Sequence, residues 1–136
     1  MNIFDIAQNL PNGFHDAELA SMCMNYMDRT ARLNLALWVG DLEDGTQREM
    51  YRPVVVRLSG VTYCIMDPPD PAYPFGASEP LTIDLTDPDP LMVMTSMPGV
   101  SFRLWVAQWN RFIHLCAKDA ALEWLGPPEQ RTASHS

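Results

Sequence analysis

Residues 31–39, ARLNLALWV, alternate between aliphatic and other side chains, and this pattern limits the fold more than any other stretch of the chain. One parity holds Ala31, Leu33, Leu35, Leu37 and Val39. Side chains on a strand point alternately to its two faces, so a period of two predicts a strand with one aliphatic face. Residues 19–27 are apolar on both parities and are joined to this strand by the short segment DRT. We therefore predict an antiparallel hairpin.

Further strand-like segments follow at short intervals, namely 51–58, 61–66, 81–85, 101–109 and 112–118. Apolar residues at helical spacing within 2–10 predict one short helix, which Pro11 and Gly13 end. Residues 91–97 fit either a strand or one helical turn. Seven or eight short strands with hairpin-scale connections predict a mainly β fold, in the form of an antiparallel sandwich or a strongly curled sheet.

The chain length of 136 residues and the hydrophobic fraction of 47% are those of one domain with one core. We predict a single β domain over residues 1–126 and a polar C-terminal tail over residues 127–136 that frays. Residues 67–80 contain five prolines and no pattern of a regular element, so they are expected to form a long loop.

The net charge is −8, from 17 acidic and 9 basic residues, and Lys118 is the single lysine. Nucleic acids and anionic membrane surfaces both attract cationic proteins, so neither is an expected partner. A basic protein partner would be attracted. The N-terminus lacks the basic and apolar regions of a signal peptide, and no apolar run is long enough to span a bilayer, which indicates a cytoplasmic protein.

The cysteines, Cys23, Cys64 and Cys116, lie far apart in apolar segments, so we expect buried, reduced thiols and no zinc site. The stretch GFHDAEL contains His15, Asp16 and Glu18. On an extended chain Asp16 and Glu18 share one face and His15 points the other way, which favours a polar corner over a metal site. We predict no metal, no cofactor and no catalytic residue.

Two other patterns have a functional alternative. His114 and Cys116 share a face of one strand, but no glycine-rich elbow accompanies them, so a nucleophilic pair is disfavoured. The acidic run at 84–90 has unevenly spaced aspartates and no following glycine, so it does not match a calcium loop. The run at 41–45 fails the same test, and both are interpreted as solvated turns. The alternative to a purely structural role is a polar site in a small-ligand or enzyme pocket lidded by loop 67–80, formed by His15, Asp16, Glu18 and His114.

In the predicted strands 31–39 and 101–109, the aliphatic residues lie on one face and the tryptophans make the opposite face apolar as well. A sheet with one solvated face does not have this pattern, so that face needs a cover. The cover is either loop 67–80, with Tyr73 and Phe75 packing inward, or a protein partner or second copy of the chain. Tryptophan and arginine are favoured at such interfaces. The predicted binding residues are Trp38, Arg103, Trp105 and Trp109, with an acidic rim of Asp41, Glu43, Asp44, Asp84, Asp87 and Asp89.

The order of these segments carries a resemblance. A short helix, FHDAEL, the alternating RLNLALWV hairpin, the LSGVTY bend and a final FRLWV…FIHLCAKDAALEWL hairpin resemble a loose group of small, mostly uncharacterised bacterial proteins. Some of these are similar to immunity proteins encoded beside secreted polymorphic toxins. The resemblance implies antiparallel strands and no catalytic residues. Together with the acidic charge, it favours a non-enzymatic protein-binding module of the immunity type over a small enzyme or ligand-binding protein.

Overall fold

The structure, a computed structural model, describes residues 1–40, 49–73, 79–87 and 98–131. The described residues form one short helix, α1 (Ile3–Gln8), and one antiparallel sheet in the order β4-β7-β6-β5-β1-β2-β3-β8, with β9 beside β3. The strands are β1 (Ala17–Asn25), β2 (Thr30–Trp38), β3 (Glu49–Ser59), β4 (Tyr63–Met66), β5 (Leu81–Thr86), β6 (Val100–Val106), β7 (Arg111–Ala117), β8 (Asp119–Trp124) and β9 (Glu129–Arg131). The prediction of a mainly β antiparallel fold is confirmed.

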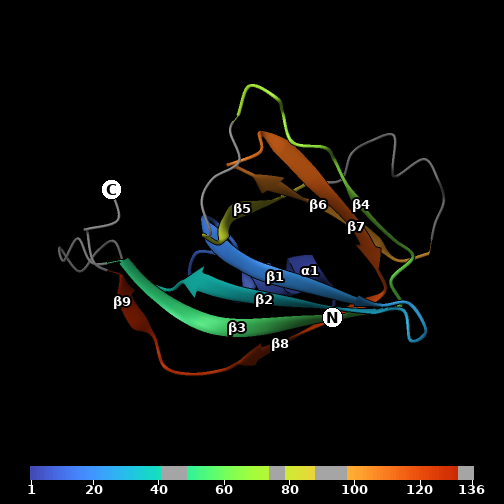
Figure 1. Cartoon of the computed structure of the whole chain (residues 1–136). Helices are drawn as coiled ribbons and strands as arrows, with labels where there is room; N and C mark the ends of the chain where they lie inside the picture. The colour runs from blue at the N-terminus through green and yellow to red at the C-terminus, as the bar shows by residue number, and fades with distance from the viewer. Residues whose placement is uncertain (41–48, 74–78, 88–97, 132–136) are drawn as a thin grey trace.

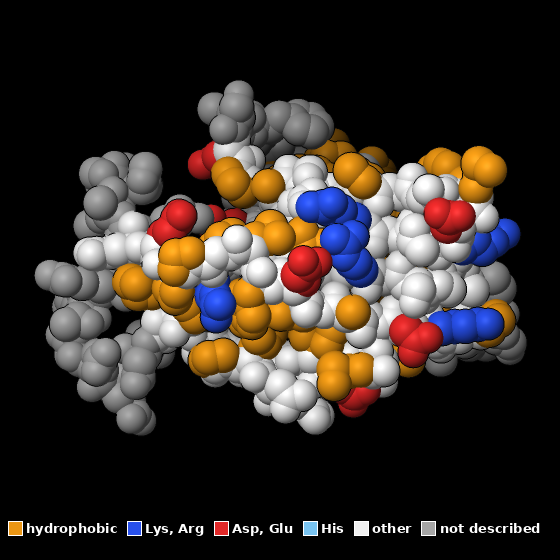
Figure 2. All heavy atoms as spheres, turned by 90° about the horizontal axis from the view of Figure 1, so that it is seen from below, with side chains coloured by type: hydrophobic (Ala, Val, Ile, Leu, Met, Phe, Trp, Pro, Cys, Tyr) orange, Lys and Arg blue, Asp and Glu red, His pale blue; other side chains and the backbone are white. Residues whose placement is uncertain are grey.

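The single open sheet is strongly curved (Figure 1). Strands β1, β2, β3 and β8 form its lower part in that view, and β5, β6, β7 and β4 rise above them. The helix α1 lies between the two parts, and its Ile3 and Ile6 are buried in the core. Each strand therefore has a core-facing side and an outer side, and we call the side turned away from the core the outer face. Figure 2 shows the molecule from below, where hydrophobic and charged side chains are mixed on the surface.

Most of the alternating segment 31–39 lies in strand β2, which has one buried aliphatic face, as predicted. Leu33, Leu35 and Leu37 on β2 are 5% exposed or less, and they alternate with more exposed neighbours. The mixed parity of β1 comes from a bulge between Leu19 and Ser21. The strand buries Leu19 before the bulge and packs Met22 against the core after it. An extra residue reverses the alternation, which explains why the segment is apolar on both parities.

Two strands were not predicted, and both pair with β3. Strand β8 pairs with the second half of β3 and directs Ala120 and Trp124 to the core. Strand β9 pairs with Glu49–Tyr51 of β3, so the expectation of a frayed tail is wrong for residues 129–131. Strand β3 is longer than the predicted 51–58, and its long edge provides partners for both segments.

The chain bends sharply at two adjacent places. Strand β3 passes into β4 through Gly60, which has φ 62°, and β7 passes into β8 through Lys118. The amide of Lys118 donates to Ser59 O at 3.0 Å, and the amide of Val61 donates to Arg29 O at 2.9 Å. The LSGVTY segment is therefore a tight bend, and it brings the start of β4 to the β1–β2 turn.

Candidate functional site

The outer face of the upper part of the sheet has a row of side chains at one level. Asp84 on β5 is the register partner of Trp105 on β6, which is the register partner of Phe112 on β7. Residues directly opposite on antiparallel strands point to the same face. The rings of Trp105 and Phe112 meet edge to face, with centroids 5.1 Å apart and an interplanar angle of 62°.

The loop between α1 and β1 extends this row. Gly13 and Asp16 take left-handed backbone conformations, with φ 54° and 52°, and turn the chain into β1. Asp84 Oδ1 accepts a hydrogen bond from the Asp16 amide at 3.2 Å and lies 2.7 Å from His15 Nδ1. The segment GFHDAEL is thus a corner, as predicted, and its polar groups bind the neighbouring strand β5.

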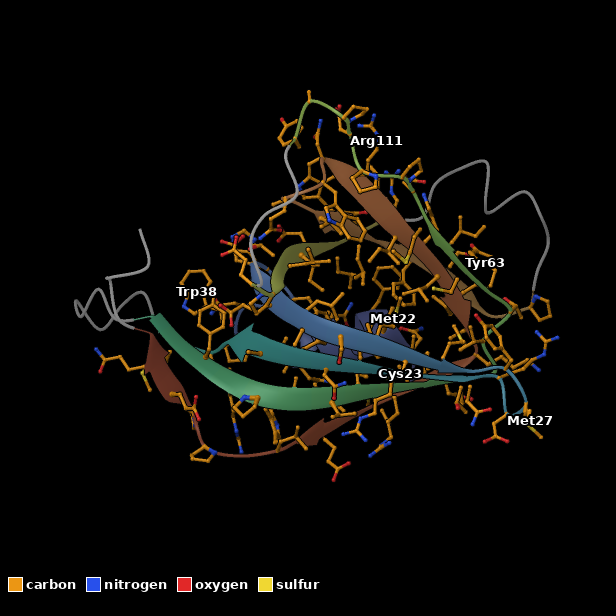
Figure 3. The ribbon with its side chains drawn as sticks, viewed as in Figure 1. Met22, Cys23, Met27, Trp38, Tyr63 and Arg111 are labelled. Carbon is orange, nitrogen blue, oxygen red and sulfur yellow. The ribbon has the colours of Figure 1, made fainter. Side chains whose placement is uncertain are left out.

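Trp38 closes the other end of the row. Its ring lies 6.0 Å from the ring of His15, between centroids, and the Tyr51 hydroxyl donates to Asp16 O at 3.1 Å to hold the loop in place. Figure 3 shows Trp38 at the end of β2 that lies under β5. We call this continuous set of outer-face side chains the cross-sheet row; it consists of Trp38, His15, Asp84, Trp105 and Phe112.

The electrostatics of His15 follow from its two carboxylate neighbours. The hydrogen bond to Asp84 raises the pKa of His15, partial burial opposes this, and the negative charges of Asp16 and Asp84 add to the increase. The Nε2 atom lies 3.5 Å from Asp16 Oδ2, so each ring nitrogen faces a different carboxylate. This arrangement suits a doubly protonated imidazolium, which has a donor on each nitrogen.

His15, Asp16 and Asp84 are also a possible ligand set, because one ligand atom from each lies within 4.8 Å of the others. A metal ion needs these atoms to converge on a single point. Here the two nitrogens of His15 face opposite ways, and its Nδ1 already hydrogen-bonds Asp84. A protonated His15 that pairs with both carboxylates accounts for this arrangement. The expectation of no metal stays a prediction.

A second group adjoins the row on β6 and β7. The guanidinium carbon of Arg103 lies 4.1 Å from the centroid of the Phe112 ring, and Arg103 Nε donates to Asp87 O at 2.9 Å. His114 is 7% exposed, and its Nε2 lies 3.0 Å from Asp67 Oδ1. Its Nδ1 is buried with no hydrogen-bond partner among the described residues.

The structure separates the residues of the predicted polar site. His15 contacts Asp84, His114 contacts Asp67, and no contact joins these two pairs in the described part of the chain. Glu18 lies on β1 opposite Thr82 of β5. Neither histidine lines either of the two larger described pockets. The four predicted residues therefore do not form one described site.

The predicted tryptophan surface is only partly formed. Trp38 and Trp105 belong to the cross-sheet row, and Arg103 adjoins it, whereas Trp109 packs against the core from the β6–β7 turn. Asp84 lies within the row and Asp87 binds Arg103 through its backbone. Four residues of the predicted acidic rim lie outside the described residues, namely Asp41, Glu43, Asp44 and Asp89.

The described part of the proline-rich loop is tied to the β6–β7 hairpin. Asp67 accepts a hydrogen bond from the Phe112 amide at 3.2 Å, and Asp70 pairs with Arg111 at 3.1 Å. Neighbouring amide hydrogen bonds are the main cause of a lowered Asp70 pKa. Tyr73 is 43% exposed, so the expectation that it packs inward is wrong. Phe75 lies outside the described residues.

The cysteines differ from one another. Cys116 is fully buried and Cys64 half-buried, but Cys23 is exposed, contrary to prediction, because the bulge in β1 directs it to the outer face. Three residues that organise the site were not predicted, namely Tyr51, Asp67 and Phe112. Phe112 shares the parity of His114, which is a usable signal, whereas no local pattern indicates the contacts of Asp67.

The fold and the row define a mainly β protein with an aromatic and acidic strip on its outer face. Comparison with protein-family models, with curated proteins and with solved structures finds no match. Among the described residues, no helix has the length and apolarity needed to cross a bilayer.

Proposed function

We propose that the chain is a non-enzymatic protein-binding module of the immunity type, and that the cross-sheet row with Arg103 contacts a basic protein partner. The observation that carries the proposal is that Trp105 and Arg103 both pack on the ring of Phe112, on an outer face where all three are only partly buried. Tryptophan and arginine are enriched among the residues that carry most of the binding energy at protein interfaces.

The charge of the strip favours a basic partner. Asp16 and Asp84 lie within or beside the row, and Asp67 and Asp70 lie near its other end. With a net charge of −8, the whole molecule also attracts a cationic protein at long range. Such attraction increases the rate of association and selects against acidic partners.

An enzyme is the weaker alternative. Nucleophilic catalysis needs a thiol or hydroxyl within hydrogen-bond reach of a base. Within the described ranges, no hydrogen bond joins His15 or His114 to a thiol or hydroxyl, and the Cys116 thiol lies 3.5 Å from Pro98 O instead. Both histidines pair with aspartates, which is compatible with a structural role.

The test is binding to the products of the adjacent genes in the native genome. We expect a basic, secreted toxin-like protein that forms a stable complex with the chain. Trp105→Ala should weaken the complex by at least about thirtyfold, as truncation of an interface anchor does. Leu125→Ala is the matched control, because Leu125 is an apolar residue that is 53% exposed and does not belong to the row. The absence of any toxin-like neighbour and of any co-purifying partner would contradict the proposal.

A further inference from the structure

A pocket of about 420 Å³ opens at the bend where the β1–β2 turn meets β4. One wall comes from Met22, Met24, Tyr26 and Arg29, and the other from residues 61–64 and Met66. Figure 3 shows Met22 on the side of β1 that faces β4 and β7, with Cys23 on the opposite side. The volume lies within the range of about 300–1,000 Å³ found for small-ligand sites.

The lining is apolar and rich in sulfur. Met22, Met24 and Cys64 pack against the core and form the inner part of the pocket, whereas Met66 and Tyr26 are 54% and 86% exposed and lie at its mouth. Methionine side chains are flexible and polarisable, so such a lining adapts to hydrocarbon or aromatic groups. The pocket therefore offers apolar contact without a fixed shape.

Most polar groups of the lining already have partners. The Tyr63 hydroxyl donates to Ser101 Oγ at 2.9 Å, and the Thr62 hydroxyl to Cys116 O at 3.5 Å. Burial raises the pKa of the Cys64 thiol, so this group is neutral at physiological pH. These groups contribute little to the polar recognition of a ligand.

Arg29 is the exception. It is the one lining residue with a charge at neutral pH, and its side chain has no hydrogen bond or ion pair within the described ranges. Its backbone is held in place, since Arg29 O accepts from the Val61 amide at 2.9 Å. By contrast, Arg57 pairs with Glu123 and Arg111 with Asp70. An unpaired guanidinium beside an apolar pocket is complementary to an anion.

We propose that this pocket binds a small apolar organic anion, with its hydrocarbon or aromatic body against the methionines and its carboxylate at Arg29. The site is separate from the cross-sheet row, because the pocket is lined by β1, the β1–β2 turn, the bend and β4, and by no residue of the row. It therefore adds a ligand site to the proposed protein-binding function and does not depend on it.

The test uses octanoate and 1-octanol, which share a hydrocarbon chain and differ in charge. The protein carries ¹³C-methyl methionine, and binding is followed by the methyl signals of Met22, Met24 and Met66. Met27 is 95% exposed in the turn and provides an internal control. We expect saturable shifts of the three pocket methyls, no shift of Met27, and tighter binding of octanoate than of octanol.

Two variants separate charge from cavity. Arg29→Gln should weaken octanoate at least about tenfold, as loss of a charge-assisted hydrogen bond does, and leave octanol unchanged. Arg57→Gln removes the same charge from an ion pair on the outer face and should change neither. Cys64→Trp should fill the pocket and abolish binding of both, with the folded state checked by a cooperative thermal unfolding transition.

Several outcomes would overturn the proposal. They are no saturable shift with either compound, equal affinity for octanoate and octanol, or octanoate binding that Arg29→Gln leaves intact. Dimerisation that shifts the three pocket methyls with protein concentration, measured together with sedimentation, would assign the pocket to a second copy of the chain.

Discussion

His15 Nδ1 lies 2.7 Å from Asp84 Oδ1, although the two residues are 69 positions apart in the chain. The contact joins the loop before β1 to the middle of β5, and it places an imidazole between two carboxylates. The protonation state of His15 is therefore linked to the position of this loop, so the pH dependence of His15 reports on the contact with Asp84.

The first prediction concerns the pH dependence of His15. Its pKa in the folded protein is raised above the unfolded value of about 6.5, so its stabilising contribution is fully present below that pH and is lost as the pH rises through the folded pKa. The side chain is 60% exposed, which makes the contribution small. Asp84→Asn should lower the pKa of His15 in an NMR titration. Asp87→Asn is the control, and an unchanged pKa in Asp84→Asn would contradict the assignment.

The second prediction concerns Asp67. This carboxylate is the partner of a buried imidazole whose Nδ1 is already unpaired, and it also accepts from the Phe112 amide. Asp67→Ala should reduce the free energy of unfolding by about 1–3 kcal/mol, measured in urea. In a His114→Phe background the same change should cost less, because no buried imidazole loses its partner. Equal costs in the two backgrounds would show that the pair does not interact.

The third prediction concerns the turn before β6. Gly99 has φ 115°, and an added Cβ would lie 2.9 Å from the carbonyl carbon of Ala117. Backbone cannot move aside as a flexible side chain does, so Gly99→Ala should destabilise the fold by at least about 1 kcal/mol. Gly126→Ala is the matched control, since a Cβ added at Gly126 would have Pro53 Cγ as its nearest neighbour, at 3.6 Å. Thermal unfolding of both variants checks the difference.

The fourth prediction concerns the thiols. Cys23 is exposed, Cys116 is fully buried, and burial raises the pKa of Cys64. At neutral pH, iodoacetamide should modify Cys23 first, since the thiolate is the reactive form. Cys64 should react only as the pH rises, and Cys116 only on unfolding. Peptide mass spectrometry measures the order, and early modification of Cys116 would show that β7 opens readily.

Much of the fold was predictable because its signals are local. The alternation in 31–39, the helical spacing in 2–10 and the hairpin-scale connections all depend on neighbours in the chain. Strand β8 was missed because its residues follow β7 after only Lys118, so no turn signal separates the two strands. Its pairing is determined by the free edge of β3, which no local pattern describes.

The candidate site was predictable only in its residue types. The parity of Trp38 and Trp105 placed both on the outer face, and the structure agrees. What brings His15 beside Asp84, and Asp67 beside His114, is the order of the strands in the sheet. Register between distant strands depends on packing of the whole core. For the same reason the sequence grouped His15 with His114, whereas the fold gives each a different aspartate.

The pairing of β3 with β8 has a consequence for synthesis. Strand β3 spans residues 49–59, and its partner at Val54–Ser59 is not made until residues 119–124 leave the ribosome. Until then one edge of β3 has no strand to pair with. That edge includes Val54, Val55 and Val56, which are all fully buried in the finished fold. Strand β8, which is translated well after β3, thus protects the edge of a strand made earlier from pairing with other chains.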